Sequence, residues 1–220
     1  MSNTVYARSE AREARQPVLV AAMRKIQLAA LVTTTREGGL KVSHMPLLVS
    51  EADNGTVRLT GHFARANDHW KIIEHGSARS VAIFQGPHTY MSPSNYATKQ
   101  ETGKVVPTWT YVIVHAHGLA ATQHDAGWLL AHVNQLTDQN EGERDVPWKV
   151  SDAPGDYVDS MLRGIVGLEL NITQLEGVWK LNQHRSDEDK ASMVAGLTSS
   201  GNKRDNRIAG IMQKTFSGSS

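Results

Sequence analysis

The alternation of apolar and polar residues along the chain predicts a protein built mainly of β-strands. Residues 109–121 are the clearest case, because the aromatic and histidine side chains fall on one face and the valines and alanines on the other. The other expected strands are 28–36, 40–50, 56–61, 80–85 and 167–175, with hairpin turns at Gly38-Gly39 and Asp53-Asn54-Gly55. Strands at this short spacing, without regular crossover helices, favour a small barrel or a meander over a doubly wound parallel sheet.

Helical periodicity fills most of the remaining sequence. An apolar stripe predicts an amphipathic helix over residues 9–26, and Asn67 or Asp68 is expected to cap a short helix that ends near Gly76. Residues 125–136 and 154–165 also read as helices. Ser186 and Asp189 form a capping-box pattern that starts a final helical stretch. A long irregular loop is expected where Pro87, Pro93 and Gly103 occur.

Length and composition narrow the class of protein. A chain of 220 residues with 40% hydrophobic content suits one domain over residues 1–220, and the Ser/Gly-rich end at 216–220 is expected to be loose. The net charge of +1 produces no strong field, so DNA binding would need a local basic cluster. Cysteine is absent, which excludes disulfides and thiolate sites. No stretch approaches the length of a spanning helix, and a cytoplasmic protein without membrane contact is expected.

The segment 60–67 is the strongest candidate for ligand chemistry. Here a strand ends at Gly61, and a capped helix begins behind Arg65 and Asn67. Backbone N–H groups at a helix start and a fork-shaped guanidinium are the groups that bind phosphate. The alternative is that Gly61 serves a turn, that Arg65 is solvated and that Asn67 is only a cap.

Other polar residues interrupt strands that are otherwise apolar. Ser43 and His44 form a polar pair in a barrel wall and could contact a ligand, or they could be satisfied by backbone carbonyls. The Gln85 amide could bond the edge of a ring or merely close a turn. His115 and His117 share one side of a strand, but two histidines do not complete a zinc site, and no metal is expected. No nucleophile elbow or P-loop pattern is present.

Several blocks together resemble the PaiB family of FMN-binding negative transcriptional regulators. The blocks are residues 43–48, 61–67, 83–88, 104–109, 151–154, 161–163 and 179–181. The resemblance spans most of the chain. It implies a mainly β fold with flanking helices, a split β-barrel related to the pyridoxamine-phosphate-oxidase-like FMN-binding proteins. It also implies a homodimer in which each flavin lies at the subunit interface.

The resemblance also implies which residues hold the cofactor. The phosphate and ribityl chain of FMN would be held by Ser43, His44, Met45, Thr60, Gly61, His62, Arg65 and Asn67. Gln85 would lie near the flavin ring, and Ser92 or Trp109 could come from the second subunit. The sequence departs from the family pattern at Asn95, Thr110, Asn182 and His184, where tryptophan, asparagine, serine and asparagine are usual.

Three functions are compatible with this sequence. The first is a flavin-binding repressor, with DNA contacts from Arg12, Arg15, Arg24 and Lys25 or from Arg185, Lys190, Lys203, Arg204 and Arg207, although no helix-turn-helix signature is evident. The second is a flavin-dependent reductase or oxidase of a small planar substrate. The third is haem or metal handling through the histidine-rich barrel wall.

Overall fold

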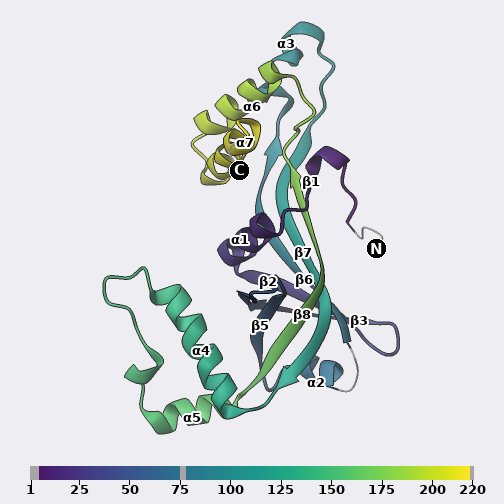
Figure 1. Ribbon diagram of the computed structural model, residues 1–220. Helices are drawn as coiled ribbons and strands as arrows, with labels where there is room; N and C mark the ends of the chain where they lie inside the picture. Colours follow the sequence, from purple (N-terminus) through teal and green to yellow (C-terminus); the bar gives the residue numbers. More distant parts are fainter. Residues whose placement is uncertain (1–4, 75–77, 219–220) are drawn as a thin grey trace. The chain divides into compact units, whose positions relative to one another are not determined.

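The computed structural model describes residues 5–74 and 78–218 and contains a sheet of 8 strands (Figure 1). The strand order is β3-β2-β6-β7-β8-β5-β4, and β1 pairs with β8. The strands are β1 (Arg12–Glu13), β2 (Leu28–Thr34), β3 (Leu40–Pro46), β4 (Leu48–Glu51), β5 (Val57–Ala64), β6 (Ala78–Met91), β7 (Thr108–Gln123) and β8 (Ile165–Lys180). The expectation of a mainly β fold with flanking helices is confirmed.

The contacts between residues divide the chain into two compact units. The first unit comprises residues 1–22, 85–114 and 176–220, and the second comprises residues 23–84 and 115–175. The helices are α1 (Gln16–Ile26), α2 (His69–Glu74), α3 (Thr98–Thr102), α4 (Ala126–Glu141), α5 (Gly155–Arg163), α6 (Asp187–Ser199) and α7 (Lys203–Phe216). The expectation of a single domain over the whole chain stays a prediction.

The second unit is the barrel. Burial alternates along β2 and β5, and the inward Leu31, Leu59, Phe63 and Leu168 are almost completely buried. The first and last parts of the strand order approach each other, because a Cβ atom built on Gly61 of β5 would lie 3.3 Å from the Met45 sulfur of β3 and 3.4 Å from the Pro46 carbonyl oxygen. This approach brings β3 against β5, as in a split barrel.

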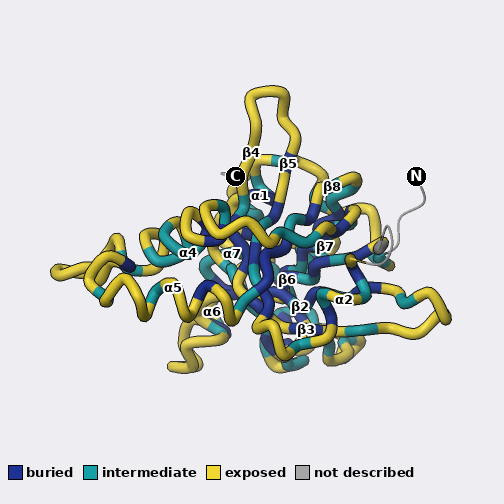
Figure 2. Tube along the Cα trace, turned by 90° about the horizontal axis from the view of Figure 1, so that it is seen from below, coloured by how far each residue is buried: buried dark blue, intermediate teal, exposed yellow. Residues whose placement is uncertain are grey.

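Helices α4 and α5 and the turns of the barrel contain many exposed residues of the second unit. Figure 2 shows the β4–β5 turn and the α4–α5 connection as exposed chain. Helix α4 begins at an Asp125 cap whose Oδ1 accepts the Trp128 N–H at 2.7 Å. One face of α4 is buried through Leu129 and His132. The helix thus covers part of the barrel wall and leaves its polar face in water.

The first unit has its own apolar core. It is formed by Met91, Tyr96, Leu181, Met193, Leu197, Ile208, Ala209 and Met212, which come from β6, from the chain after it, from the residue that follows β8, and from α6 and α7. Helix α6 begins at the Ser186 cap, whose Oγ accepts the Asp189 N–H at 3.2 Å, as the capping pattern predicts. The apolar faces of α6 and α7 therefore meet over this part of the sheet.

Several expected elements are confirmed with small shifts in their ends. Strand β7 alternates as predicted, with Val112, Val114 and Ala116 buried on one face. The last strand is longer than expected because β8 runs from Ile165 to Lys180. Helix α7 extends to Phe216, the first residue of the tail that was expected to be loose, and residues 219–220 of that tail lie outside the described chain.

Other expectations about the elements were wrong. The helix expected over residues 9–26 begins only at Gln16, because Pro17 suits a first helical turn and Arg12–Glu13 pairs with β8 instead. The expected strand 40–50 is two strands, since the Leu47 N–H turns away to donate to the Gln27 carbonyl at 3.0 Å.

The irregular loop expected from Pro87 onward begins later than predicted. Pro87 lies within β6, beyond Ile83, the last residue of β6 that pairs with β2. A proline is tolerated there because no β2 carbonyl requires its missing N–H. The rest of the expected loop contains a 3-10 turn (Pro93–Asn95) and the short helix α3.

Candidate functional site

The corner where β5 leads into α2 holds Arg65 in a fixed orientation. Its Nε donates to the Arg163 carbonyl at 2.8 Å and its Nη2 donates to the Ile165 carbonyl at 3.0 Å. The residue is exposed, and no ion pair joins it to a carboxylate within the described parts of the chain. Two of the five guanidinium N–H groups are thus used for orientation, and the other three remain for an anion.

Asn67 and Ser43 lie together in the second unit, where they bind each other and the start of α2. The Asn67 Nδ2 donates to the Ser43 Oγ at 3.0 Å, and the Asn67 Oδ1 accepts the His69 N–H at 3.1 Å. The Ser43 Oγ lies 2.8 Å from the His69 Nδ1. These bonds fix the start of α2 against β3. Asn67 therefore acts as the predicted cap, and it also positions the chain that carries Arg65.

The candidate residues of β3 and β5 divide between the two faces of the barrel wall. Ser43, Met45 and Gly61 face inward, and a Cβ atom on Gly61 would come within 2.7 Å of Leu47. Gly61 is required for close packing at the barrel seam. The polar pair expected inside the wall is divided, because His44 alternates to the exposed face.

Thr60 and His62 lie on the outer face of β5. The His62 Nδ1 is 3.1 Å from the Nε2 of His132 on α4, and the Trp128 ring stacks on the His132 ring with centroids 5.3 Å apart. Burial lowers the pKa of His62, and burial together with the neighbouring His62 lowers the pKa of His132 to about 4. The pair is therefore neutral at physiological pH.

The candidate residues Gln85, Ser92 and Trp109 belong to the first unit. Gln85 is exposed on β6, and the Ser92 Oγ accepts the Ser94 N–H at 3.2 Å to cap a 3-10 turn. Trp109 is 52% exposed, and its ring centroid lies 6.1 Å from that of the half-exposed Tyr90. The two rings meet edge to face at an interplanar angle of 69°, which leaves the exposed Trp109 ring available to contact a planar ligand.

The departures from the family pattern have local structural partners in the first unit. The buried Thr110 donates through its Oγ1 to the Thr89 carbonyl at 3.1 Å, and the buried Asn182 donates to the Tyr96 hydroxyl at 3.1 Å. Asn95 contacts α6, since a Cβ atom on Gly196 would lie 2.6 Å from its Oδ1. His184 instead lines a polar hollow of ≈ 390 Å³ together with Arg8, Lys180 and Arg185.

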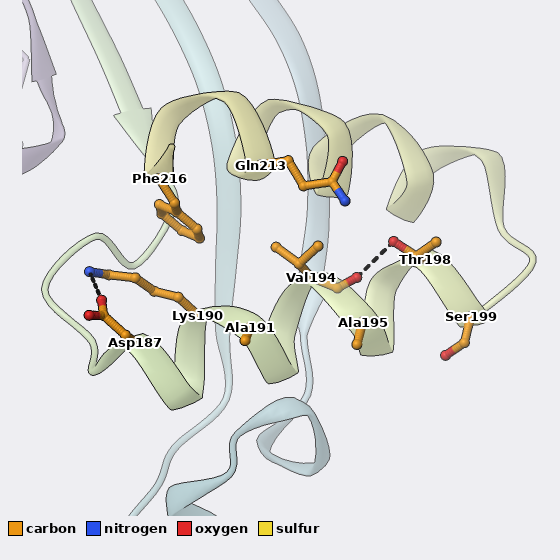
Figure 3. A pocket seen from close by; sticks show the side chains of 9 residues that line it. All are labelled: Asp187, Lys190, Ala191, Val194, Ala195, Thr198, Ser199, Gln213 and Phe216. Atoms are coloured by element: carbon orange, nitrogen blue, oxygen red, sulfur yellow. Dashed lines mark hydrogen bonds and ion pairs between the residues drawn. The ribbon is translucent and has the colours of Figure 1, made fainter. Parts of the chain in front are cut away.

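A surface hollow of ≈ 680 Å³ lies along the pair formed by α6 and α7 (Figure 3). Its floor consists of small and apolar residues such as Ala191, Val194 and Ala195. Its one lysine, Lys190, is paired with Asp187, with the Nζ and Oδ1 atoms 3.0 Å apart. The hollow therefore lacks the uncompensated cation that phosphate binding needs.

Within residues 5–74 and 78–218, no group of three or more histidine, aspartate or glutamate side chains is arranged to hold a metal ion. Over the same residues, no helix combines the length and the apolar character needed to cross a bilayer.

A second concave site, which was not predicted from the sequence, lies in the first unit. It has a volume of ≈ 390 Å³ and is lined by cations that include Arg8, Lys180 and Arg185. Lys180 belongs to one of the family blocks, residues 179–181. The sequence therefore singled out this residue but gave no function for it. Arg8 carried no signal, because its place in the hollow depends on how the N-terminal segment runs over the sheet.

Known proteins resemble this chain in both sequence and fold. A sequence model of the family described as “Putative FMN-binding domain” matches residues 5–174. The chain is 30% identical over 182 residues to the protease synthase and sporulation protein PAI 2 of Bacillus subtilis, covering 83% of this chain and 84% of that protein. It is 29% identical to an uncharacterised protein of Emericella nidulans, covering 96% and 97% of the two chains.

Solved structures resemble this chain in fold. The FAD and haem binding protein of Mycobacterium smegmatis matches with a TM-score of 0.58 and 14% identity, covering 82% of this chain and 79% of that chain. The flavocytochrome Anf3 of Azotobacter vinelandii matches with a TM-score of 0.52 and 15% identity, covering 86% and 80%. With the family match and the relationship to PAI 2, these findings show that the chain is a split-barrel protein that belongs to the PaiB-like family of FMN-binding domains.

Proposed function

We propose that this protein binds FMN as a homodimer and acts as a negative regulator of transcription. The observation that carries the flavin assignment is Arg65, which two backbone carbonyls hold at the end of β5 in a chain whose family is described as FMN-binding. An exposed, oriented guanidinium without a carboxylate partner among the described residues suits a phosphate group. When bound, FMN supplies redox chemistry, while the protein supplies orientation and electrostatics.

The other candidate residues have distinct roles in this proposal. Ser43 and Asn67 position the corner, and Met45 and Gly61 close the barrel beneath it. The outward His44, Thr60 and His62 are the groups available to the ribityl chain. Gln85, Ser92 and Trp109 stay predictions for the ring side, and the exposed Trp109 and Tyr90 rings favour Trp109 among them.

The outer face of β2, β3 and β6 supports the homodimer. Residues 42, 32 and 81 form a cross-strand row of three valines, and His44, Ala30 and Ile83 form the next row. None of these outward side chains is buried in the isolated chain, and Val42 is 49% exposed. The solvent face of an antiparallel sheet is normally polar, so an apolar face of this extent favours coverage by a second copy of the chain.

Titration of flavin-free protein with FMN, followed by flavin fluorescence, tests the role of Arg65. We expect Arg65→Gln to weaken FMN binding by about 1.5–3 kcal/mol, the range of a hydrogen bond to a charged group. Arg65→Lys keeps the charge but loses the fork, so an intermediate loss is expected. Arg36→Gln, at an exposed arginine of the β2–β3 turn, is the matched control. Equal affinity in wild type and Arg65→Gln would refute the assignment.

Helix α7 supports the regulatory part of the proposal. Its first turns expose Lys203, Arg204 and Arg207, and no ion pair among the described residues neutralises them. The hydroxyl of Thr89 donates to the Asp205 carboxylate, which anchors this end of the helix. Cations at a helix N-terminus are repelled by the positive end of the helix dipole. A nearby phosphate would reduce this repulsion.

A DNA titration at several salt concentrations tests this surface. For three phosphate contacts, the slope of log affinity against log salt should be about −2 to −3. Replacing Lys203, Arg204 and Arg207 with glutamine should remove most of this slope, whereas Arg36→Gln should keep it. Absence of binding to a duplex of about 30 base pairs at low salt would contradict direct repression.

A further inference from the structure

The hollow of ≈ 390 Å³ in the first unit is a partly enclosed polar site whose lining residues are not among the proposed flavin contacts. Its walls are the N-terminal segment around Arg8, the start of β7, the end of β8, and the chain that leads into α6. The rings of Tyr96 and Tyr111 line it together with cationic side chains. A concave site with apolar walls and a few convergent polar groups is the usual form of a small-molecule site.

Lys180 is held at the end of β8 by neutral acceptors. Its Nζ donates to the Thr108 Oγ1 at 2.8 Å and to the Trp109 carbonyl at 2.9 Å, and it lies 5.5 Å from the centroid of the Tyr111 ring. An ammonium group has three N–H donors, so one donor remains. Burial, and then the nearby Arg8, lower the pKa of Lys180, so burial and a like charge both disfavour the ammonium form in the empty hollow.

Arg185 is the second fixed cation. Its guanidinium carbon lies 4.6 Å from the centroid of the Tyr96 ring, and Tyr96 is itself held through its hydroxyl by Asn182. The Arg185 Nε is buried and has no hydrogen-bond partner among the described residues. The nearest carboxylate is that of Asp189, whose Oδ2 lies 3.8 Å from the Nη1 and whose Oδ1 accepts the Thr98 N–H at 2.9 Å.

The lining of the hollow carries an excess of positive charge. Arg8, Lys180 and Arg185 are cations, and Glu10 is the one carboxylate among the lining residues. The Glu10 Oε1 lies 3.9 Å from both the Arg8 Nη1 and the His184 Nδ1. Cations gathered at a partly enclosed site repel one another, and an anion placed between them removes that repulsion.

We propose that this hollow binds a small anion in which a carboxylate or phosphate group is attached to an apolar ring. Lys180 and Arg185 bind the anionic group, with Arg8 closing over it from the N-terminal segment. The tyrosine rings contact the apolar part of the ligand. The site goes beyond the proposed flavin and DNA contacts and gives the protein a second small ligand.

Isothermal titration of the purified protein with four probes tests the proposal. Benzoate and phenyl phosphate carry the two anionic groups on the same ring, benzamide is the neutral counterpart, and inorganic phosphate lacks the ring. We expect benzoate to bind at least about tenfold more tightly than benzamide, equivalent to about 1.4 kcal/mol. We also expect phenyl phosphate to bind more tightly than inorganic phosphate. The tighter of benzoate and phenyl phosphate identifies the anionic group.

Variants assign the binding to the hollow. Lys180→Met keeps most of the aliphatic stem and should raise the Kd of the better probe at least about tenfold, the loss of a charged hydrogen bond. Arg8 has an exposed side chain, so Arg8→Gln leaves the fold intact and should raise the Kd about three- to tenfold. Arg36→Gln, at the exposed arginine of the β2–β3 turn, is the control and should leave the Kd unchanged.

Three results would overturn the site. The first is equal affinity for benzoate and benzamide, or no binding of either anionic probe at millimolar concentration. The second is an unchanged Kd in both Arg8→Gln and Lys180→Met. The third is a raised Kd for FMN in Arg8→Gln, which would assign the hollow to the flavin and not to a separate anion.

Discussion

Two buried histidines of the second unit make the stability of the protein depend on pH. His69 is 0% exposed and its Nε2 has no partner, while His132 is 3% exposed and its Nδ1 has none, in each case among the described residues. Burial, with a smaller contribution from Lys41, lowers the pKa of His69 to about 4. The pKa of His132 is also lowered to about 4, by burial and then by His62.

The sign of the effect follows from these directions. In the unfolded chain a histidine has a pKa of about 6.5, so between about pH 6.5 and 4 the unfolded state binds the proton and the folded state does not. The stabilisation is complete above about pH 6.5 and is lost as the pH falls. At about pH 5 the loss is about 2 kcal/mol for each histidine, and the sum is a large part of a typical stability of about 5–15 kcal/mol.

Urea unfolding followed by tryptophan fluorescence, at about pH 7.5 and about pH 5, measures this difference. His132→Phe removes one titrating ring and keeps an aromatic ring against Trp128, so the difference between the two pH values should shrink by about 2 kcal/mol. The free energy at neutral pH can also change, because His62 loses its partner, but the pH difference is the readout. His124→Gln, at an exposed histidine, is the control. A full wild-type difference in His132→Phe would refute the reasoning.

Two further predictions concern packing and assembly. Gly118→Ala should destabilise the protein by about 2–3 kcal/mol, because the new Cβ would lie 2.2 Å from the Asn171 carbonyl oxygen, a backbone atom of β8. Gly155→Ala, where a new Cβ would have nothing within 4 Å, is the control in the same urea assay. Equal stability of the two variants would contradict the close packing at Gly118. Val42→Lys should shift the mass in light scattering toward the monomer and weaken FMN binding, and a dimer with unchanged FMN affinity would argue against an interface on this face.

The sequence alone determined the features that depend on neighbouring residues. The alternation of β7 predicted its buried face because successive side chains of a strand point to opposite sides. The Ser186 cap and the Asn67 cap were predicted because a helix start must satisfy its first N–H groups locally. The family blocks predicted the split barrel and the PaiB-like family, which the family match and the fold confirm.

Only the tertiary structure decided the features that depend on distant segments. Pairing with β8 converts Arg12–Glu13 from the expected helix into a strand. The Ser43 hydroxyl is used by α2, and Arg65 is oriented by carbonyls about 100 residues away in sequence. The anion hollow joins Arg8 to Lys180 and Arg185. Local periodicity fixes which face of an element is buried, but the partner of a polar group depends on which segments meet, and that is set by the packing of the whole chain.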